Sequence, residues 1–280
     1  MKKAVIYIVL AIISVSCVER IEVELDPNYV RLAVDGSITT DTSKYTVNLT
    51  QTADYFYNAP IPRVTNAKVT IFDGDSIYTL NETVPGQSGV YESGSNIVGS
   101  AGKTYTLNIS LPTEIGGNTS YSSSCELMSV THLDSTNVLF HEDWGEEGFY
   151  EVKIFAQEPG NEVNYYMFNL YRNGKLMSDS ISKVVVSDDK YINGSYINGL
   201  GAFYLDNSRP DQKLIPGDII TLQMSGITKE YYNFVSEVQT AGFNIPFFMG
   251  PPANVVGNVN NGGVGFFTAY SNSYATTIVK

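Results

Sequence analysis

The chain has few of the residues on which most catalytic and metal sites depend. Its 280 residues include two cysteines, two histidines and one tryptophan. Two cysteines cannot form the disulfide framework of a small secreted domain. The histidines, His132 and His141, belong to no His-Glu-x-x-His zinc motif, and no Gly-x-Ser-x-Gly nucleophile elbow occurs. We therefore expect a protein that is not an enzyme and that carries no metal and no cofactor.

Basic residues are also scarce. Lysine and arginine number 17 against 29 aspartate and glutamate residues, which gives a formal net charge of −12. A chain of this sign repels phosphate backbones and anionic lipid surfaces, so we exclude nucleic acid as a partner. The apolar fraction of 43% is that of a globular protein and not of a disordered one.

The N-terminal apolar run is too short to span a bilayer, which takes about 20 residues. It extends from Ala4 to Val15, follows Lys2 and Lys3, and leads through small residues to Cys17. These are the parts of a secretory signal peptide. The arrangement resembles a bacterial lipoprotein signal, although Ser14 stands where such signals usually carry leucine. We predict a signal peptide over residues 1–16 and lipidation of Cys17, for example with palmitate; the alternative is an ordinary secretory signal in which this cysteine has no role.

Residues 17–28 form a predicted acidic tether between the lipid and the folded body. Glu19, Glu22 and Glu24 loosely resemble the acidic export cue of some surface lipoproteins. Loss of the two leader lysines changes the formal net charge from −12 to −14. We therefore expect a lipid-anchored protein that is exposed at the cell surface.

The first part of the body consists of short alternating runs separated by turn residues. Tyr29 to Ile38, Tyr45 to Leu49 and Lys103 to Ile109 alternate apolar with polar residues, as half-buried strands do. Asp73-Gly74-Asp75 lies between two further runs and predicts a hairpin. We expect residues 29–127 to form an antiparallel sandwich of immunoglobulin-like or transthyretin-like character.

Residues 128–280 are predicted to form a second β-rich domain. The Gly- and Ser-rich segment from Pro112 to Ser124 is the expected boundary or excursion between the two domains. Residues 228–241 follow helical spacing, with Gly242 at the stop position, and predict one amphipathic helix. Cys125 lies in an alternating stretch, so we expect a buried, inert thiol.

Two segments have the composition of recognition loops. Tyr191 to Gly199 is rich in tyrosine, serine, glycine and asparagine, which suits adaptable binding surfaces. Ile245 to Pro252 is apolar and stiffened by proline, as exposed partner sites can be. The candidate residues are Tyr191, Asn193, Tyr196, Asn198, Phe247, Phe248 and Met249. The alternatives are a decorated hairpin for the first segment and packing on the helix for the second.

Acidic clusters offer weaker candidates. His141 to Glu147 could supply a carboxylate pair or a metal site, but a solvated loop before the next strand accounts for the same residues. Asp73 with Asp75, and Asp188 with Asp189, could offer oxygen ligands to calcium. Neither pair has the spacing of a known calcium loop, so we predict a hairpin turn for the first and a surface turn for the second.

The C-terminal third combines backbone-shaping glycine, asparagine and proline residues with aromatic anchors. The segments are Pro216-Gly217-Asp218, Pro246-Phe247-Phe248, Pro252 to Val255, Asn258 to Phe267 and Tyr270-Ser271. Together with Cys17 to Glu22 and Val34 to Ile38, they resemble the domain-of-unknown-function family 4249 (DUF4249) over the mature chain. Gly257 departs from the pattern, because serine is common there. The resemblance implies an outer-membrane lipoprotein found with TonB-dependent transporters, and it implies no catalytic residue.

The sequence leaves three functional hypotheses. The first is a non-enzymatic, outer-membrane-anchored accessory or ligand-capture subunit whose partner is a TonB-dependent transporter or another outer-membrane protein. The second is an envelope hydrolase acting on glycan or peptide, for which the acid cluster would have to act. Its members are Glu142, Asp143, Glu146 and Glu147. The third is a surface adhesin or structural protein.

Overall fold

The computed structural model describes residues 30–53, 60–160, 162–242 and 255–280. The predicted signal peptide, Cys17, the tether and the candidate residues Phe247, Phe248 and Met249 lie outside the described residues. The described part of the chain is mainly β, with 52% strand and 6% helix, in a sandwich-like arrangement. The predicted fold class is therefore confirmed.

One large sheet contains most of the strands. In its first part the strands lie in the order β1, β2, β5, β4, β3, β6, β7. Their bounds are β1 (Leu32–Thr39), β2 (Thr46–Gln51), β3 (Lys68–Phe72), β4 (Ile77–Glu82), β5 (Val90–Ser93), β6 (Thr104–Ile115) and β7 (Asn118–Glu126). The sheet curls so that β7 contacts β15 (Val264–Ile278) across a first hydrophobic core. That core is built from the alternate buried positions of these strands, such as Leu32, Ile71 and Leu107.

The sequence predicts one of two turns in this part correctly and the other incorrectly. Asp73 closes the β3–β4 hairpin, because its Oδ1 accepts bonds from the backbone N–H groups of Asp75 at 3.0 Å and Ser76 at 2.7 Å. The sequence predicts the Pro112 to Ser124 segment as a boundary or an excursion between two domains, and this prediction is wrong. Most of it belongs to β6 and β7, which form a hairpin whose turn residues, Gly116 and Gly117, have positive φ. Serine and threonine on the exposed face of a hairpin have the same composition as a linker.

The remaining strands build a second core. The three-stranded sheet has the order β13 (Tyr196–Asp206), β9 (Phe149–Gln157), β8 (Leu133–His141). The large sheet continues beyond β15 through β14 (Ile219–Ile227) to β10 (Tyr165–Arg172), whose far edge pairs with β11 (Lys175–Leu176) and β12 (Val185–Asp188). Apolar side chains of both sheets, including Val152, Leu170 and Leu222, pack together in this second core.

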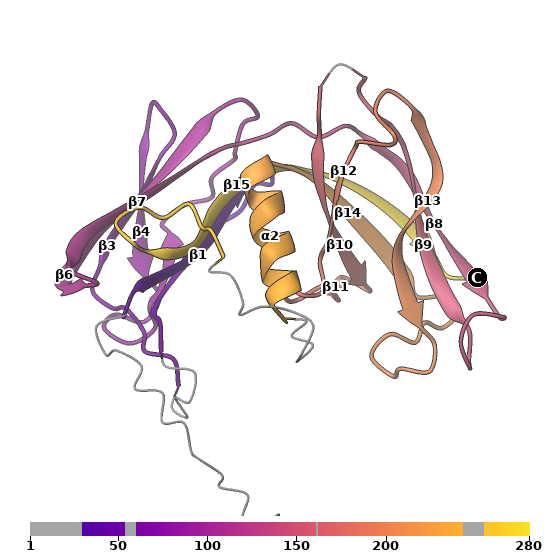
Figure 1. Cartoon of the computed structure of the whole chain (residues 1–280), viewed down its shortest axis with the longest axis horizontal. Helices are drawn as coiled ribbons and strands as arrows, with labels where there is room; N and C mark the ends of the chain where they lie inside the picture. Colours follow the sequence, from indigo (N-terminus) through magenta and orange to yellow (C-terminus); the bar gives the residue numbers. More distant parts are fainter. Residues whose placement is uncertain (1–29, 54–59, 161, 243–254) are drawn as a thin grey trace, which may run out of the picture.

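Strand β15 connects the two groups of strands. Its first half pairs in parallel with β1, and its second half pairs antiparallel with β14. Accordingly, Phe267 and Ala269 belong to the first core, whereas Val279 just beyond the strand belongs to the second. Figure 1 shows β15 crossing between the two groups, which spread apart as an arch. The division into domains at residues 127 and 128 stays a prediction, but the two groups share this strand.

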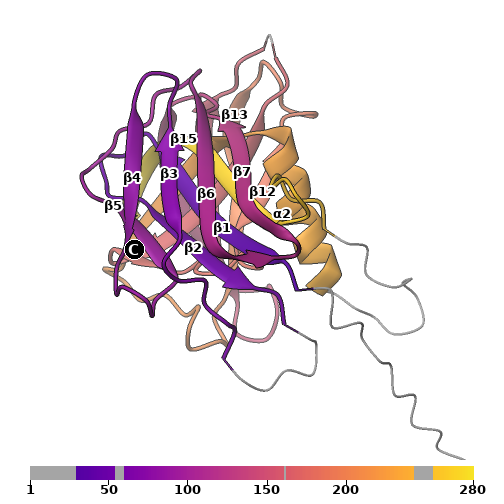
Figure 2. The same cartoon turned by 90° about the vertical axis from the view of Figure 1, so that its left-hand side faces the viewer.

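The predicted helix over residues 228–241 is observed as α2 (Lys229–Gly242). Its first turn is capped by Thr228, whose Oγ1 accepts a bond from the N–H of Tyr231 at 3.3 Å. The helix lies inside the arch, and Figure 2 shows it beyond the edge of β7 (Figures 1 and 2). Of the helices in the described ranges, none has the length and hydropathy needed to cross a membrane.

Candidate functional site

A cleft of about 820 Å³ lies on the inner face of the arch, beside α2. Four neighbouring strands, β10, β14, β15 and β1, provide its floor. The pairing register places one residue of each strand beside its neighbour: Asn169 pairs with Gln223, Gln223 with Tyr274, and Thr268 with Ser37. Because paired residues point to the same face of a sheet, the polar side chains of four strands converge there.

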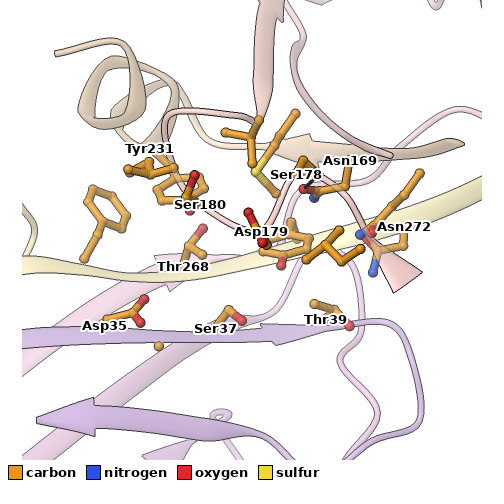
Figure 3. Close-up of a pocket in the computed structure, with 18 of the residues that line it drawn as sticks. Asp35, Ser37, Thr39, Asn169, Ser178, Asp179, Ser180, Tyr231, Thr268 and Asn272 are labelled. Atoms are coloured by element: carbon orange, nitrogen blue, oxygen red, sulfur yellow. Dashed lines mark hydrogen bonds between the residues drawn. The ribbon is translucent and has the colours of Figure 1, made fainter. Parts of the chain in front are cut away.

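The opposite face of the same strands is apolar and buried. Leu170, Leu222 and Phe267 alternate with the cleft residues and enter the two cores. Because side chains alternate between the two faces of β15, one face packs in the core and the other is available for binding. Figure 3 shows Thr268 and Asn272 on β15 above Ser37 and Thr39 on β1.

Aromatic rings form the wall beneath α2. The ring centroids of Tyr231 and Phe234, on the helix, lie 5.0 and 5.1 Å from that of Phe266 on β15. These distances are typical of favourable tilted aromatic pairs. Gln239 fixes the far end of the helix, because its Nε2 donates to the carbonyl oxygens of Ile181 at 2.8 Å and Val184 at 2.9 Å. The helix is thus tied both to the floor and to the rim of the cleft.

A hydrogen-bonded network centred on Asn272 organises the floor. Its Nδ2 donates to Asp41 Oδ2 at 2.7 Å, and its Oδ1 accepts from Ser225 Oγ at 2.7 Å and from Gln223 Nε2 at 2.8 Å. Tyr274 also donates to Asp41 Oδ2, at 2.6 Å, and Tyr171 donates to Gln223 Oε1 at 2.8 Å. Ser225 and Gln223 are buried. Such a connected network holds its polar groups in one arrangement before any ligand arrives.

The tyrosines of the cleft are neutral phenols at physiological pH. Burial raises the pKa of Tyr270 to about 12. It also raises the pKa of Tyr231, and burial together with the bond to Asp41 raises that of Tyr274. Each phenol therefore keeps its proton and can donate a hydrogen bond.

The charge of the cleft has one sign. Asp35, Asp41 and Asp179 line it, and among the described lining residues there is no lysine, arginine or histidine. Asp179 pairs with Lys183 at 2.8 Å, but both side chains are more than half exposed, so solvent screens this pair. In the described part of the chain, the side chain of Asp35 accepts a hydrogen bond from one neutral donor, Asn48 Nδ2, at 3.1 Å.

One buried hydroxyl in the cleft lacks a conventional partner. Thr268 is 3% exposed, and its Oγ1 has no hydrogen bond of ordinary geometry to the described part of the chain. The thiol of Cys125 lies near it, but a thiol is a weak partner. Figure 3 shows the Thr268 hydroxyl pointing from β15 toward Ser180 and Tyr231. The group is therefore placed to bond something that enters the cleft.

Cys125 itself behaves as predicted. The thiol is free and buried, and burial raises its pKa. A thiol with a raised pKa forms little thiolate, which is the reactive species.

A second cavity, of about 570 Å³, lies on the other side of the segment that follows β11. It shares Leu176, Ser178 and Asp179 with the first. Its lining is predominantly basic, with four cationic side chains and two acidic ones. The cationic residues are Arg172, Lys175, Lys183 and Arg209, and the acidic ones are Asp179 and Asp211. Two neighbouring cavities thus carry charges of opposite sign.

The predicted loop from Tyr191 to Gly199 lies apart from both cavities. Tyr191 is 87% exposed and Tyr196 is 50% exposed. Asn193 is tied down, since its Nδ2 donates to the carbonyl oxygen of Glu162 at 2.6 Å and to Asp189 Oδ2 at 3.0 Å. Asn198 is an exposed residue of β13. The recognition role of this loop stays a prediction.

Asp189 was expected on a surface turn, and this prediction is wrong. Its side chain is 1% exposed and accepts bonds from Asn193 and from the N–H of Asn164 at 2.9 Å. Glu158, also 1% exposed, lies in the same region and accepts a bond from Tyr166 at 2.6 Å. Burial raises the pKa of Glu158. The two carboxyl groups fix the base of the exposed loop.

The acid cluster is exposed, as predicted for a solvated loop. Glu142, Asp143, Glu146 and Glu147 are all exposed. The four side chains therefore face solvent and do not line a buried site. His141 instead bonds Glu151 at 2.8 Å and stacks on Trp144 at 3.7 Å. In the described ranges no group of three or more histidine, cysteine or acidic residues is placed to hold a metal ion, which includes the surroundings of His132.

Sequence reasoning missed the cleft. Its strand residues come from four separate segments of the chain. The segments of β1 and β15, at opposite ends of the described chain, meet through the parallel pairing of these two strands. One local signal existed. From Phe266 to Tyr274, every second position is aromatic or polar, and the intervening Phe267, Ala269 and Ser271 are buried. That pattern indicates a strand with a binding face opposite a core face.

Comparison with known proteins gives the family. A family model described as domain of unknown function (DUF4249) matches residues 18–276, and the chain belongs to this family. A search of curated proteins finds no match. Among solved structures, the chain is similar to one titled "Cytokine receptor complex - Crystal form 1A". That likeness has 10% identity and a TM-score of 0.25, covers 88% of this chain and 95% of the other, and carries no argument about function.

Proposed function

We propose that the protein is a non-enzymatic, lipid-anchored subunit that captures a ligand for an outer-membrane transporter assembly. The anchor is Cys17, and the capture site is the cleft beside α2. The observation that carries the proposal is the Asn272 network, because it presents fixed polar groups and aromatic rings in a cavity of about 820 Å³. Ligand sites typically have volumes of about 300–1,000 Å³ with a few convergent polar groups.

The sequence features favour the membrane part of the proposal. A signal peptide that ends immediately before Cys17 would leave a cysteine at the mature N-terminus. One acyl chain gives only marginal membrane binding, so a stable anchor takes a second one. The resemblance to the DUF4249 pattern suggests a TonB-dependent transporter as the partner. A tether of about 12 residues, at about 3.3 Å per residue, would hold the cleft up to roughly 40 Å from the lipid.

The test is recovery of partners from native membranes. The tagged full chain is purified from mildly solubilised membranes of its own bacterium, beside a Cys17→Ala variant and a cleft variant, Tyr274→Phe. We expect a transporter to be recovered with the wild-type protein and to be lost with Cys17→Ala. Tyr274→Phe removes one bond to Asp41 and should leave the partner in place while reducing ligand uptake in cells.

Two results would contradict the proposal. Recovery of the wild-type protein without any stable membrane partner would remove the transporter role. Full function of an unanchored Cys17→Ala protein in cells would remove the anchor from the mechanism, whatever the cleft binds.

A further inference from the structure

We infer that the cleft binds a cationic ligand, an extended peptide segment that carries arginine or lysine. The inference rests on the proposed function, because it names the ligand that the capture site selects. Its first support is the sign of the lining charge. Three carboxylates, Asp35, Asp41 and Asp179, face the cleft, and its described lining contains no cationic side chain. Asp179 pairs with the exposed Lys183, which lies outside the lining, so Asp35 and Asp41 carry the inference. An anionic ligand would lose its hydration there and gain no counter-charge.

Neutral donors hold two of these carboxylates, Asp35 and Asp41. Asp41 receives the amide of Asn272 and the hydroxyl of Tyr274, and Asp35 receives the amide of Asn48. Neutral donors orient a carboxylate without cancelling its charge, so Asp35 and Asp41 remain available to pair with a cation. The formal net charge of −12 over the chain attracts the same class of ligand at longer range.

The aromatic rings supply the second support. Tyr231, Phe234 and Phe266 form one wall, and Tyr270 and Tyr274 continue it along β15. The face of an aromatic ring attracts arginine and lysine side chains. Aromatic rings beside carboxylates that lack a counter-charge thus favour a cation over a neutral sugar. A neutral sugar would stack on the rings but form no ion pair with the carboxylates.

The shape of the cleft favours an extended segment. Its floor crosses four strands, and adjacent strands lie about 4.8 Å apart, which gives a length near 15 Å. A peptide extends by about 3.3 Å per residue, so four or five residues fit this length. The Thr268 hydroxyl lies in the buried floor with the weakly bonding Cys125 thiol beside it, and it can bond a peptide carbonyl or N–H group there.

The second cavity strengthens the selection. Its four cationic side chains attract acidic groups, and the segment containing Leu176, Ser178 and Asp179 separates it from the cleft. The acidic cleft repels acidic ligands and the basic cavity attracts them. This repulsion adds to the specificity of the cleft for cations.

The experiment is a calorimetric titration of the purified full chain in detergent at low ionic strength. The probes are a five-residue peptide with two arginines, the same peptide with citrulline in place of arginine, the same peptide with glutamate, and a neutral hexasaccharide. Citrulline retains the shape of arginine and lacks its charge. We expect the arginine peptide to bind, the citrulline peptide to bind at least tenfold more weakly, and the other two probes not to bind in the cleft.

Three variants locate the binding. Asp35→Asn and Asp41→Asn keep oxygen acceptors for the same donors, so the fold should be retained, as urea unfolding will verify. Each should lower the affinity for the arginine peptide about tenfold, and this loss of affinity should be smaller at high salt. Glu114→Gln removes an exposed carboxylate on β6, outside the cleft, and should leave the affinity unchanged.

The outcomes separate the inference from the proposed function. Equal binding of the arginine and citrulline peptides, tighter binding of the hexasaccharide, or no binding of the arginine peptide would overturn the cationic ligand. If the membrane partner is still recovered in any of these cases, the capture role stands with a different ligand. Failure of partner recovery leaves the peptide affinity intact and removes only the transporter role.

Discussion

Asn272 is the residue whose removal should most clearly expose the organisation of the cleft. Its side chain makes three hydrogen bonds of 2.7–2.8 Å, to Asp41, Ser225 and Gln223. Asn272→Ala leaves all three without this partner, although Tyr274 still bonds Asp41 and Gln223 still reaches Ser225 at 3.2 Å. At about 1 kcal/mol for each net hydrogen bond, with a further penalty for buried groups left unpaired, we expect a loss of about 2–4 kcal/mol in the free energy of unfolding.

Urea denaturation followed by tyrosine and tryptophan fluorescence measures this loss. With a denaturant slope of about 3 kcal/mol per molar urea, the midpoint should fall by roughly 1 M. The matched control is Asn48→Ala, which also shortens an asparagine beside an aspartate. Asn48 makes one exposed bond, to Asp35 at 3.1 Å, so its loss should cost no more than about 0.5 kcal/mol.

An equally small change in the unfolding free energy for Asn272→Ala and Asn48→Ala would contradict this prediction. The Asn272 bonds would then contribute no more than an exposed contact, and the floor would not be a preorganised network. A variant that is destabilised but binds the arginine peptide with unchanged affinity would separate the network from recognition.

Two further predictions concern Gly265 of β15 and Asp73 of the β3–β4 hairpin. Gly265 has φ of 90°, and an added Cβ would overlap the carbonyl oxygen of Val34 on the paired strand, so Gly265→Ala should cost at least about 3 kcal/mol or abolish folding. Gly262→Ala is the control, because its φ of 77° gives similar backbone strain with no atom within 4 Å of the added carbon. In the β3–β4 hairpin, backbone N–H donors lower the pKa of Asp73 from 3.8 to about 2, with a smaller contribution from Lys103. Its charge therefore contributes stability above pH 3.8 that is lost as the pH falls through about 2; Asp73→Asn should lose about 1–2 kcal/mol at neutral pH, and urea titrations should show this difference disappearing in acid.

The sequence predicts the local elements well, because their signals are local. Helical spacing and a glycine at the stop position identify α2 to within one residue, and Asp73-Gly74-Asp75 identifies a hairpin turn. The same reasoning fails where composition has two meanings. The segment from Pro112 to Ser124 has the composition of a linker but forms a hairpin, and Asp189 has the sequence context of a surface turn but is buried.

The cleft could not be derived in this way, because it depends on long-range pairing. Asn272 and Asp41 are separated by 231 positions and meet only after β15 has paired with β1. Gly257 illustrates the same limit. The sequence shows only that it departs from the serine common in the family, whereas in the structure an added Cβ would overlap the carbonyl oxygen of Gly265. Here the position has no room for a serine side chain.

The shared strand explains why recognition and stability are linked in this fold. Phe267 and Ala269 anchor β15 in the first core, and the alternate residues Thr268, Tyr270 and Asn272 face the cleft. A substitution on the cleft face therefore changes binding groups directly, whereas one on the core face moves the strand that carries them. Because β15 pairs with β1 on one side and with β14 on the other, such a movement would shift Asp35 relative to Asn272. Ligand selectivity should consequently be sensitive to the packing of Phe267, although this side chain is fully buried and lies outside the cleft lining.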